Sequence, residues 1–417
     1  EIIRIYRGGM YREDKYMNKI RNILKMNRYY KNITMPKYAL LSYTLILLFV
    51  SCGQKDKLSI KDQLVTNEAL LTSTLNNDSL IVKRTNSIYA ESFIAFNEVY
   101  QSSAKNYNSI NNQINGFSKI EHRTENIDFD FSSFAAFYKV LEINQIGSKD
   151  LDSQKNIIFN YYENELSSRK YKRSYEYGSK IAVIVTNNFK NHKGFNIIDD
   201  IDELGYNYPK NFINIPKSEL ISNGKELIKI NNKLSDLQKI ICNYWEGNND
   251  KQIKKINIEG HWYSILSHKI KNTNMPISEI SKIYAILGLT INEAYKIGEY
   301  EEYKTTYISP NNIIKNNLDQ NWQPYLKNNI NEFNSITSIV SLSASNIISN
   351  YLKDNSAFID SSIYKYTGRV RNYNSLEEAA SEASISRAYG GIHYIFTANE
   401  AAGQGKFLAS KILNQIK

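Results

Sequence analysis

Apolar side chains that recur every three or four residues are the feature that most limits what this chain can fold into. From about residue 68 onward they form one stripe after another, and no run of alternating apolar and polar residues predicts a long strand. No internal repeat or long linker interrupts them, so the pattern predicts an all-α, single multi-helix domain over residues 66–417. The clearest stripes are Ile88, Tyr89, Phe93, Phe96 and Val99; Phe134, Phe137, Tyr138 and Leu141; Ile181, Val183, Ile184 and Phe189; and Ile280, Ile283, Tyr284, Leu287, Ile291 and Ala294.

The N-terminal 51 residues have a different character. Residues 1–37 carry a net charge of +7 out of +10 for the whole chain, so the remainder is only about +3 and predicts no nucleic-acid-binding face. An apolar run, 38–50, follows; it is too short to span a bilayer comfortably and predicts a signal peptide that ends at residue 51. Residues 52–65 are then expected to form a polar tether before the helical domain.

The end of this leader, Ser51-Cys52, resembles a bacterial lipoprotein signal with Cys52 as the lipidated residue. The alternative is an ordinary signal peptide with an incidental cysteine. The resemblance implies an exported lipoprotein that is held to a membrane by its lipid, on the periplasmic side or at the cell surface. Cys242 is the second of two cysteines, and its apolar neighbours predict a buried free thiol.

A permanent cation and an imidazole stand six residues apart near the C-terminus. Arg387 precedes His393 across the pair Gly390-Gly391, which lets the backbone turn. A guanidinium beside an imidazole is suited to holding a tetrahedral oxyanion through charge-assisted hydrogen bonds. The segment therefore predicts an anion site.

Residues 375–393, with Gly403 and Gly405 after them, strongly resemble the C-terminal motif of vanadium-dependent haloperoxidases, which share their fold with type 2 phosphatidic acid phosphatases. The resemblance implies a helical bundle in which three motifs converge on one oxyanion: Lys and Arg, then Ser-Gly-His, then Arg and His. The last His attacks phosphorus or binds vanadium, and vanadate activates peroxide as a Lewis acid. Coverage is about residues 66–415, through the further stretches 87–97, 240–245, 260–262 and 321–324.

Carried onto this chain, the third motif is intact and the first is not. Arg387 would be an anion clamp, and His393 the nucleophile or vanadium ligand. The family's first-motif Lys falls on Glu302 and its Arg on Ser309. A carboxylate at Glu302 would repel the anion that Arg387 attracts.

The second motif reads Ser335-Ile336-Thr337. Ser335 leaves a hydroxyl and Ile336 a backbone N–H for the anion, but Thr337 replaces the acid/base imidazole. Loss of one preorganised donor lowers a rate by about 10²–10³-fold, and loss of a general acid by about 10²–10⁴-fold. The three losses predict a catalytically impaired homologue.

Two interpretations of Arg387 remain open. It binds a phosphate- or vanadate-like anion weakly with Ser335 and His393, or it pairs with Glu302 and persists only as structure. The expectation is a pseudoenzyme with a binding or structural role and no cofactor. The alternative is an active phosphomonoesterase or haloperoxidase, with vanadate as its cofactor in the second case.

Several other residues of chemical interest have simpler interpretations. His261, beside Trp262, is expected to be a hydrogen-bonded core histidine, because no partner stands at metal-binding spacing. His122 and His192 lie in polar sequence that predicts a solvated surface. The Gly403-Gln404-Gly405 segment needs only close packing as its explanation.

Overall fold

The computed structural model describes residues 57–77, 85–104, 107–121, 126–192, 215–246, 257–271, 273–304, 308–326 and 335–416, without the side chains of 246, 300–304, 366 and 367. Residues from Leu58 onward form one compact unit. The predicted leader and Cys52 lie outside the described residues, as does His122.

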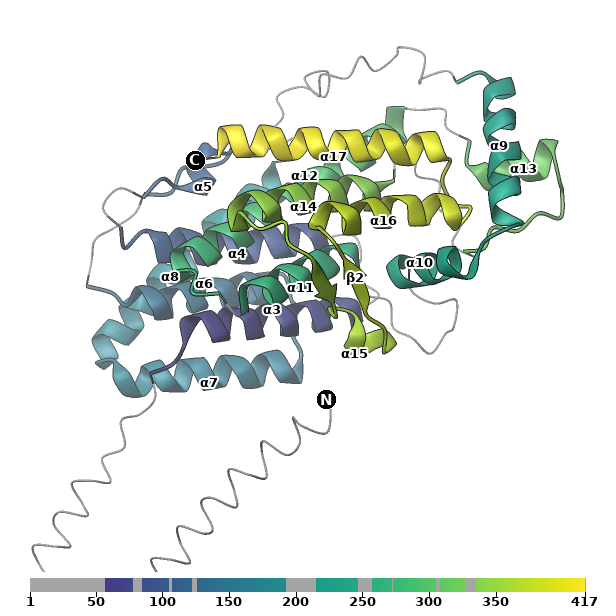
Figure 1. Ribbon diagram of the computed structural model, residues 1–417. Coiled ribbons are helices and arrows are strands. Elements are labelled where there is room, and N and C mark those ends of the chain that lie inside the picture. The colour runs from purple at the N-terminus through teal and green to yellow at the C-terminus, as the bar shows by residue number, and fades with distance from the viewer. Residues whose placement is uncertain are drawn as a thin grey trace, which may run out of the picture. The chain divides into compact units, whose positions relative to one another are not determined.

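The described elements are almost all helical, which confirms the predicted fold class (Figure 1). The strands β1 (Phe358–Asp360) and β2 (Arg371–Tyr373) pair antiparallel, with Ile359 opposite Asn372. The helices are α3 (Ile60–Asn77), α4 (Thr85–Gln101), α5 (Ile110–Gln113), α6 (Phe129–Ile143), α7 (Lys149–Glu165), α8 (Ser168–Asn191), α9 (Lys217–Asn231), α10 (Asp236–Glu246), α11 (Ile258–Lys271), α12 (Ile277–Lys304), α13 (Pro310–Asn317), α14 (Ile336–Leu352), α15 (Tyr364–Thr367), α16 (Leu376–Tyr389) and α17 (Ile395–Gln415).

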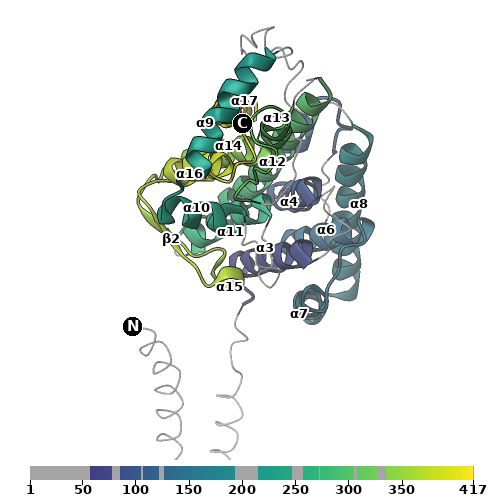
Figure 2. The same ribbon diagram turned by 90° about the vertical axis from the view of Figure 1, so that its right-hand side faces the viewer.

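Helix α4 lies at the centre of the packing, between α6 and α12 (Figure 2). Helix α8 covers α6, while α12 packs in turn on α14, and α14 on α16 and α17. Helix α3 runs antiparallel to α11: Nζ of Lys61 bonds the carbonyl of Thr273 at 2.6 Å, and the amide of Asn257 bonds Oδ1 of Asn76 at 3.0 Å.

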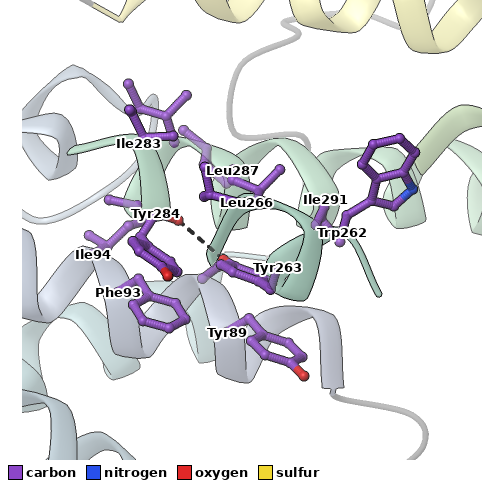
Figure 3. Close-up of a cluster of buried hydrophobic side chains, with 14 of the residues drawn as sticks. Tyr89, Phe93, Ile94, Trp262, Tyr263, Leu266, Ile283, Tyr284, Leu287 and Ile291 are labelled. Carbon is purple, nitrogen blue, oxygen red and sulfur yellow. Dashed lines mark hydrogen bonds between the residues drawn. The ribbon is translucent and has the colours of Figure 1, made fainter. Parts of the chain in front are cut away.

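The core forms where the predicted stripes of α4 and α12 meet α11. Phe93 stacks on Tyr263 and Tyr284, with ring centroids 5.0 and 4.8 Å apart, and Tyr89 stacks on Tyr263 at 4.6 Å (Figure 3). All four rings are buried. Aromatic pairs of this kind contribute about 0.5–1.5 kcal/mol each beyond the burial of their area, so this cluster fixes how the three helices pack.

Helix starts follow from side-chain capping. Ser148, Ser167 and Ser375 each accept a hydrogen bond from the backbone N–H three residues later, at the starts of α7, α8 and α16. An N-cap of this type contributes about 1 kcal/mol by satisfying a donor that the helix leaves open. At the start of α16, the side chain of Glu378 also accepts a hydrogen bond from the amide of Asn374, the residue before the N-cap.

Three details differ from the sequence-based prediction. Residues 60–65, expected in the tether, form the first turns of α3. The short hairpin of β1 and β2 was not predicted, because three residues per strand are too few to show alternation. Val183, placed in a buried stripe, is 40% exposed on α8. Among the described residues, none of the helices combines the length and the apolar character needed to cross a membrane.

Candidate functional site

The turn after α16 holds Arg387 and His393 close together. The carbonyl of Arg387 accepts hydrogen bonds from the amides of Ile392 and His393, at 3.2 and 3.4 Å, and the amide of Gly391 bonds the carbonyl of Ala388 at 3.0 Å. This is a Schellman termination, in which the residue at Gly391 must adopt a positive φ. Gly391 has a φ of 79°, so the glycine predicted to let the chain turn does so.

The N-terminus of α14 lies at the same end of the bundle. Oγ of Ser384 in α16 donates to Oγ of Ser338 in the first turn of α14 at 2.8 Å. Ser335 and Arg387 each lie one turn beyond this bonded pair, toward the end of the bundle. Ser335 is the N-cap of α14, and its hydroxyl accepts from the amide of Ser338 at 3.2 Å, which leaves the O–H free to donate.

Ile336, which the sequence resemblance places at the motif's glycine, occupies space against α12. A Cβ at Gly298 would lie 2.4 Å from Cγ1 of Ile336, so α12 can approach only because residue 298 has no side chain. Thr337 is half-buried at the start of α14. Glu302 lies in the last turn of α12, one turn beyond Gly298, and its side chain is outside the described part of the structure.

Ser309 lies near the same end of the bundle, because the residue before it is bonded to the residue after His393. It is the N-cap of α13 and is 6% exposed, without a side-chain capping bond. Its preceding residue, Ile308, accepts a 3.5 Å hydrogen bond at its carbonyl from the hydroxyl of Tyr394, the residue after His393. Burial raises the pKa of this tyrosine, which keeps its hydroxyl a neutral donor.

The structure thus brings the third motif, the start of α14 and the region of Ser309 to one end of the bundle. Arg387 is 2% exposed and His393 is fully buried. A guanidinium and an imidazole removed from water exert stronger fields on a nearby group than they would at a surface. Chemically, the described groups offer one permanent cation, one imidazole and a helix N-terminus with a hydroxyl.

Sequence reasoning missed the residues that hold this end together. Nδ2 of Asn231, the last residue of α9, donates to the carbonyl of Tyr389 at 2.9 Å, and its Oδ1 accepts from the amide of Tyr325 at 3.1 Å. These partners lie 158 and 94 residues away along the chain, so no local pattern could have shown them. Tyr394 carried only the weak signal of adjacency to His393.

His261 is the hydrogen-bonded core histidine that the sequence predicted. Its Nε2 lies 2.8 Å from Oδ2 of Asp360, and its ring stacks on Trp245 at 4.5 Å. Burial tends to raise the pKa of Asp360, but His261 and hydrogen bonds from Ser362 outweigh it and lower the pKa. Tyr244 donates to the carbonyl of Asp360 at 3.1 Å, so this network joins α10, α11 and the hairpin.

Other predictions are partly confirmed. Cys242 is a buried free thiol, 3.5 Å from the carbonyl of Ser386. Gly405 serves close packing, because a Cβ there would lie 2.5 Å from the carbonyl oxygen of Ile339. The prediction for His192 was wrong: it is half-buried at the end of α8 and packs edge-on against Phe117. No cluster of three or more His, Cys, Asp or Glu side chains that could hold a metal ion occurs in the described ranges.

These features define an almost entirely helical bundle that buries an Arg–His turn and a helix N-terminus at one end. Residues 291–417 match the family model described as the VCPO second helical-bundle domain. The crystal structure of the first bacterial vanadium-dependent iodoperoxidase is similar, with a TM-score of 0.74 and 22% identity over 87% of this chain and 98% of that one. The chain therefore has the fold of the vanadium haloperoxidase superfamily, as the sequence resemblance predicted.

More distant structures agree. The holo-type bacterial vanadium-dependent chloroperoxidase has a TM-score of 0.57 and 12% identity, over 80% of this chain and 92% of that one. The apo-type enzyme gives the same TM-score and identity, over 80% and 93%. A search of curated proteins finds no match. At these identities the similarity to the solved structures concerns the fold.

Proposed function

We propose that this protein is an exported lipoprotein that retains the vanadium haloperoxidase fold without its turnover, and that its Arg387–His393 turn has a binding or structural role. One observation carries the proposal. Ile336 stands where the family's second motif has glycine, and its side chain fills the space beside Gly298 of α12. Apolar volume thus occupies the start of α14, where the backbone of a glycine would leave room for an anion.

The charges at the motif positions support the same conclusion. Vanadate and phosphate are stabilised by several fixed cations and donors that replace their water. Of the motif positions, Arg387 is cationic, whereas Glu302 is acidic and Ser309 and Thr337 are neutral. The residues therefore do not fit a multiply charged oxyanion as the family's motifs do.

The basic leader, the apolar run and Cys52 support the location. A lipid on Cys52 would hold the protein to a membrane, with only seven residues between that cysteine and the start of α3 at Ile60. A chain of that length spans at most about 25 Å when extended. The helical domain would therefore stay close to the membrane surface.

The proposal is tested by anion binding and by activity. Vanadate and phosphate at millimolar concentration are expected to leave the melting temperature unchanged. The purified protein is expected to show neither phosphatase nor halide-oxidation activity, because the donors that stabilise the transition state are missing. A vanadate-dependent rise in melting temperature that His393→Ala abolishes would overturn the proposal and favour the active enzyme.

A gain of binding is expected when the charge at residue 302 is reversed. Glu302→Lys restores the type of residue that the first motif carries and removes a repulsive carboxylate. One charge-assisted hydrogen bond contributes about 1.5–3 kcal/mol, so the Kd for phosphate or vanadate should fall by roughly tenfold to a hundredfold. Isothermal titration calorimetry measures this change.

The matched control is Glu299→Lys, which makes the same charge change on an exposed position of α12. Glu299→Lys should leave the anion affinity within about twofold, since an exposed charge is screened by salt. Equal gains in the two variants would show a general charge effect. If Glu302→Lys does not increase the anion affinity, the placement of the first-motif Lys at residue 302 is contradicted.

A further inference from the structure

Helices α9 and α13 and residues 318–326 form a small unit at the end of the bundle, which we call the end cap. Gly224 lets α9 approach α13 closely, since a Cβ there would lie 3.2 Å from side-chain atoms of Ile314 and Leu318. Figure 1 shows both helices beyond the ends of the long helices, on the side where α16 ends and α17 begins. The cap therefore lies over the Arg387–His393 turn.

The apolar contacts of the end cap are separate from the main core. Leu227, Ile314 and Trp322 form one small cluster, and Leu220 and Ile313 form another with Tyr394. Small clusters of this size bury far less apolar surface than the core of α4, α11 and α12. Regions with few buried apolar contacts open at lower free energy than the whole fold.

One side chain of the cap binds the turn and also ties α9 to residues 318–326. Asn231 binds the carbonyl of Tyr389 through Nδ2 and the amide of Tyr325 through Oδ1. Next to these bonds, the amide of Leu326 bonds the carbonyl of Gly390 at 2.9 Å. A Cβ at Gly391 would lie 2.9 Å from Nδ2 of Asn231, so the amide lies against the turn itself.

We propose that the end cap is a lid over the Arg387–His393 turn and that Asn231 is the positioning residue that latches it. Arg387 and His393 are buried when the latch is closed, so a solute reaches them only through an opened state. The bond from Nδ2 of Asn231 to Tyr389 crosses between the cap and the turn, whereas the bond from the amide of Tyr325 to Oδ1 of Asn231 holds α9 to residues 318–326 within the cap. The latch follows from these contacts alone and does not rest on the function proposed above.

Hydrogen–deuterium exchange of the purified, full-length protein tests the latch. Asn231→Asp keeps the acceptor for Tyr325 but loses the donor and sets a carboxylate against the carbonyl of Tyr389. Amides of α9, α13 and residues 388–394 should exchange roughly tenfold to a hundredfold faster, as for the loss of one buried hydrogen bond. Amides of α4 and α12 should be unchanged, and diethyl pyrocarbonate should modify His393 faster.

The matched control is Asn223→Asp on the same helix, because among the described residues Nδ2 of Asn223 bonds only the carbonyl of Glu219, one turn away, at 3.0 Å. It should alter exchange in α9 alone. In the unmodified protein, the cap and residues 388–394 should exchange together through an opening that is less sensitive to denaturant than the exchange of α4. A uniform rise across α4 and α12 in Asn231→Asp, or a cap and turn that exchange independently, would overturn the inference. Anion affinity is measured separately, so failure of the proposed function leaves this result intact.

Discussion

Replacement of His261 by alanine is expected to lower the free energy of unfolding by about 3–5 kcal/mol, measured by urea denaturation at pH 7. The lowered pKa of Asp360 keeps its carboxylate ionised at this pH, and the carboxylate is 2% exposed. Without His261 it would retain the hydrogen bonds from Ser362 but lose its charged or donating partner at 2.8 Å. A buried carboxylate without that partner is the costly outcome.

Two further variants separate charge from packing. His261→Phe keeps a ring to stack on Trp245 but removes Nε2. We therefore expect it to lower the free energy of unfolding almost as much as His261→Ala does. His268→Ala, at an exposed position of the same helix, should change the free energy of unfolding by less than about 0.5 kcal/mol. Full recovery of stability in His261→Phe would show that the stack, and not the bond to Asp360, is what stabilises this network.

The pH dependence has a definite sign. Because folding lowers the pKa of Asp360, the pair contributes stability above the unfolded pKa of about 3.8 and loses it as the pH falls through the folded value. In His261→Ala this acid-dependent contribution should shrink. The difference between the two proteins should therefore narrow as the pH falls below about 4.

The helices were predictable because their apolar faces are local in sequence. The stripe from Ile88 to Val99 became buried α4, and that from Ile280 to Ala294 became the buried part of α12. The prediction that Val183 is buried was wrong, because α8 has solvent on one face and periodicity alone cannot show where a buried stripe ends. The prediction missed the hairpin because three residues per strand are too few to show alternation, and because its contacts with the bundle, such as the bond of Tyr373 to Glu382 at 2.7 Å, are tertiary.

In the candidate site, too, the features that are local in sequence were predictable and those that depend on tertiary packing were not. The turn from Arg387 to His393 was predictable, since the glycine pair and the spacing are local. The hydroxyl pair of Ser384 and Ser338 could not be predicted, because it joins residues 46 apart. The same is true of Asn231, whose two bonds depend on where α9 packs. Residue identities thus suggested the chemistry, and tertiary packing determined which groups cover it.

A buried carboxyl group joins the first helix to the core. Glu68 of α3 is 1% exposed and accepts hydrogen bonds from Thr72 at 2.8 Å and from Ser267 of α11 at 2.5 Å. Ser267 in turn lies 2.6 Å from the hydroxyl of Tyr284, one of the stacked rings in Figure 3. Burial raises the pKa of Glu68 to about 7, although the two hydrogen bonds oppose the rise.

Glu68→Gln is therefore expected to stabilise the protein at pH 8 relative to the unchanged chain. A pKa raised in the folded state from 4.5 to about 7 favours the protonated form. The native protein has this stabilisation below pH 4.5 and loses about 3 kcal/mol of it as the pH rises through 7. Glutamine keeps an acceptor and has no charge to bury, so the variant should not show this loss.

Urea denaturation from pH 4 to 8 measures the difference between the two proteins. Glu176→Gln, at an exposed position of α8, should parallel the native curve, and a Glu68→Gln curve that also parallels it would contradict the raised pKa.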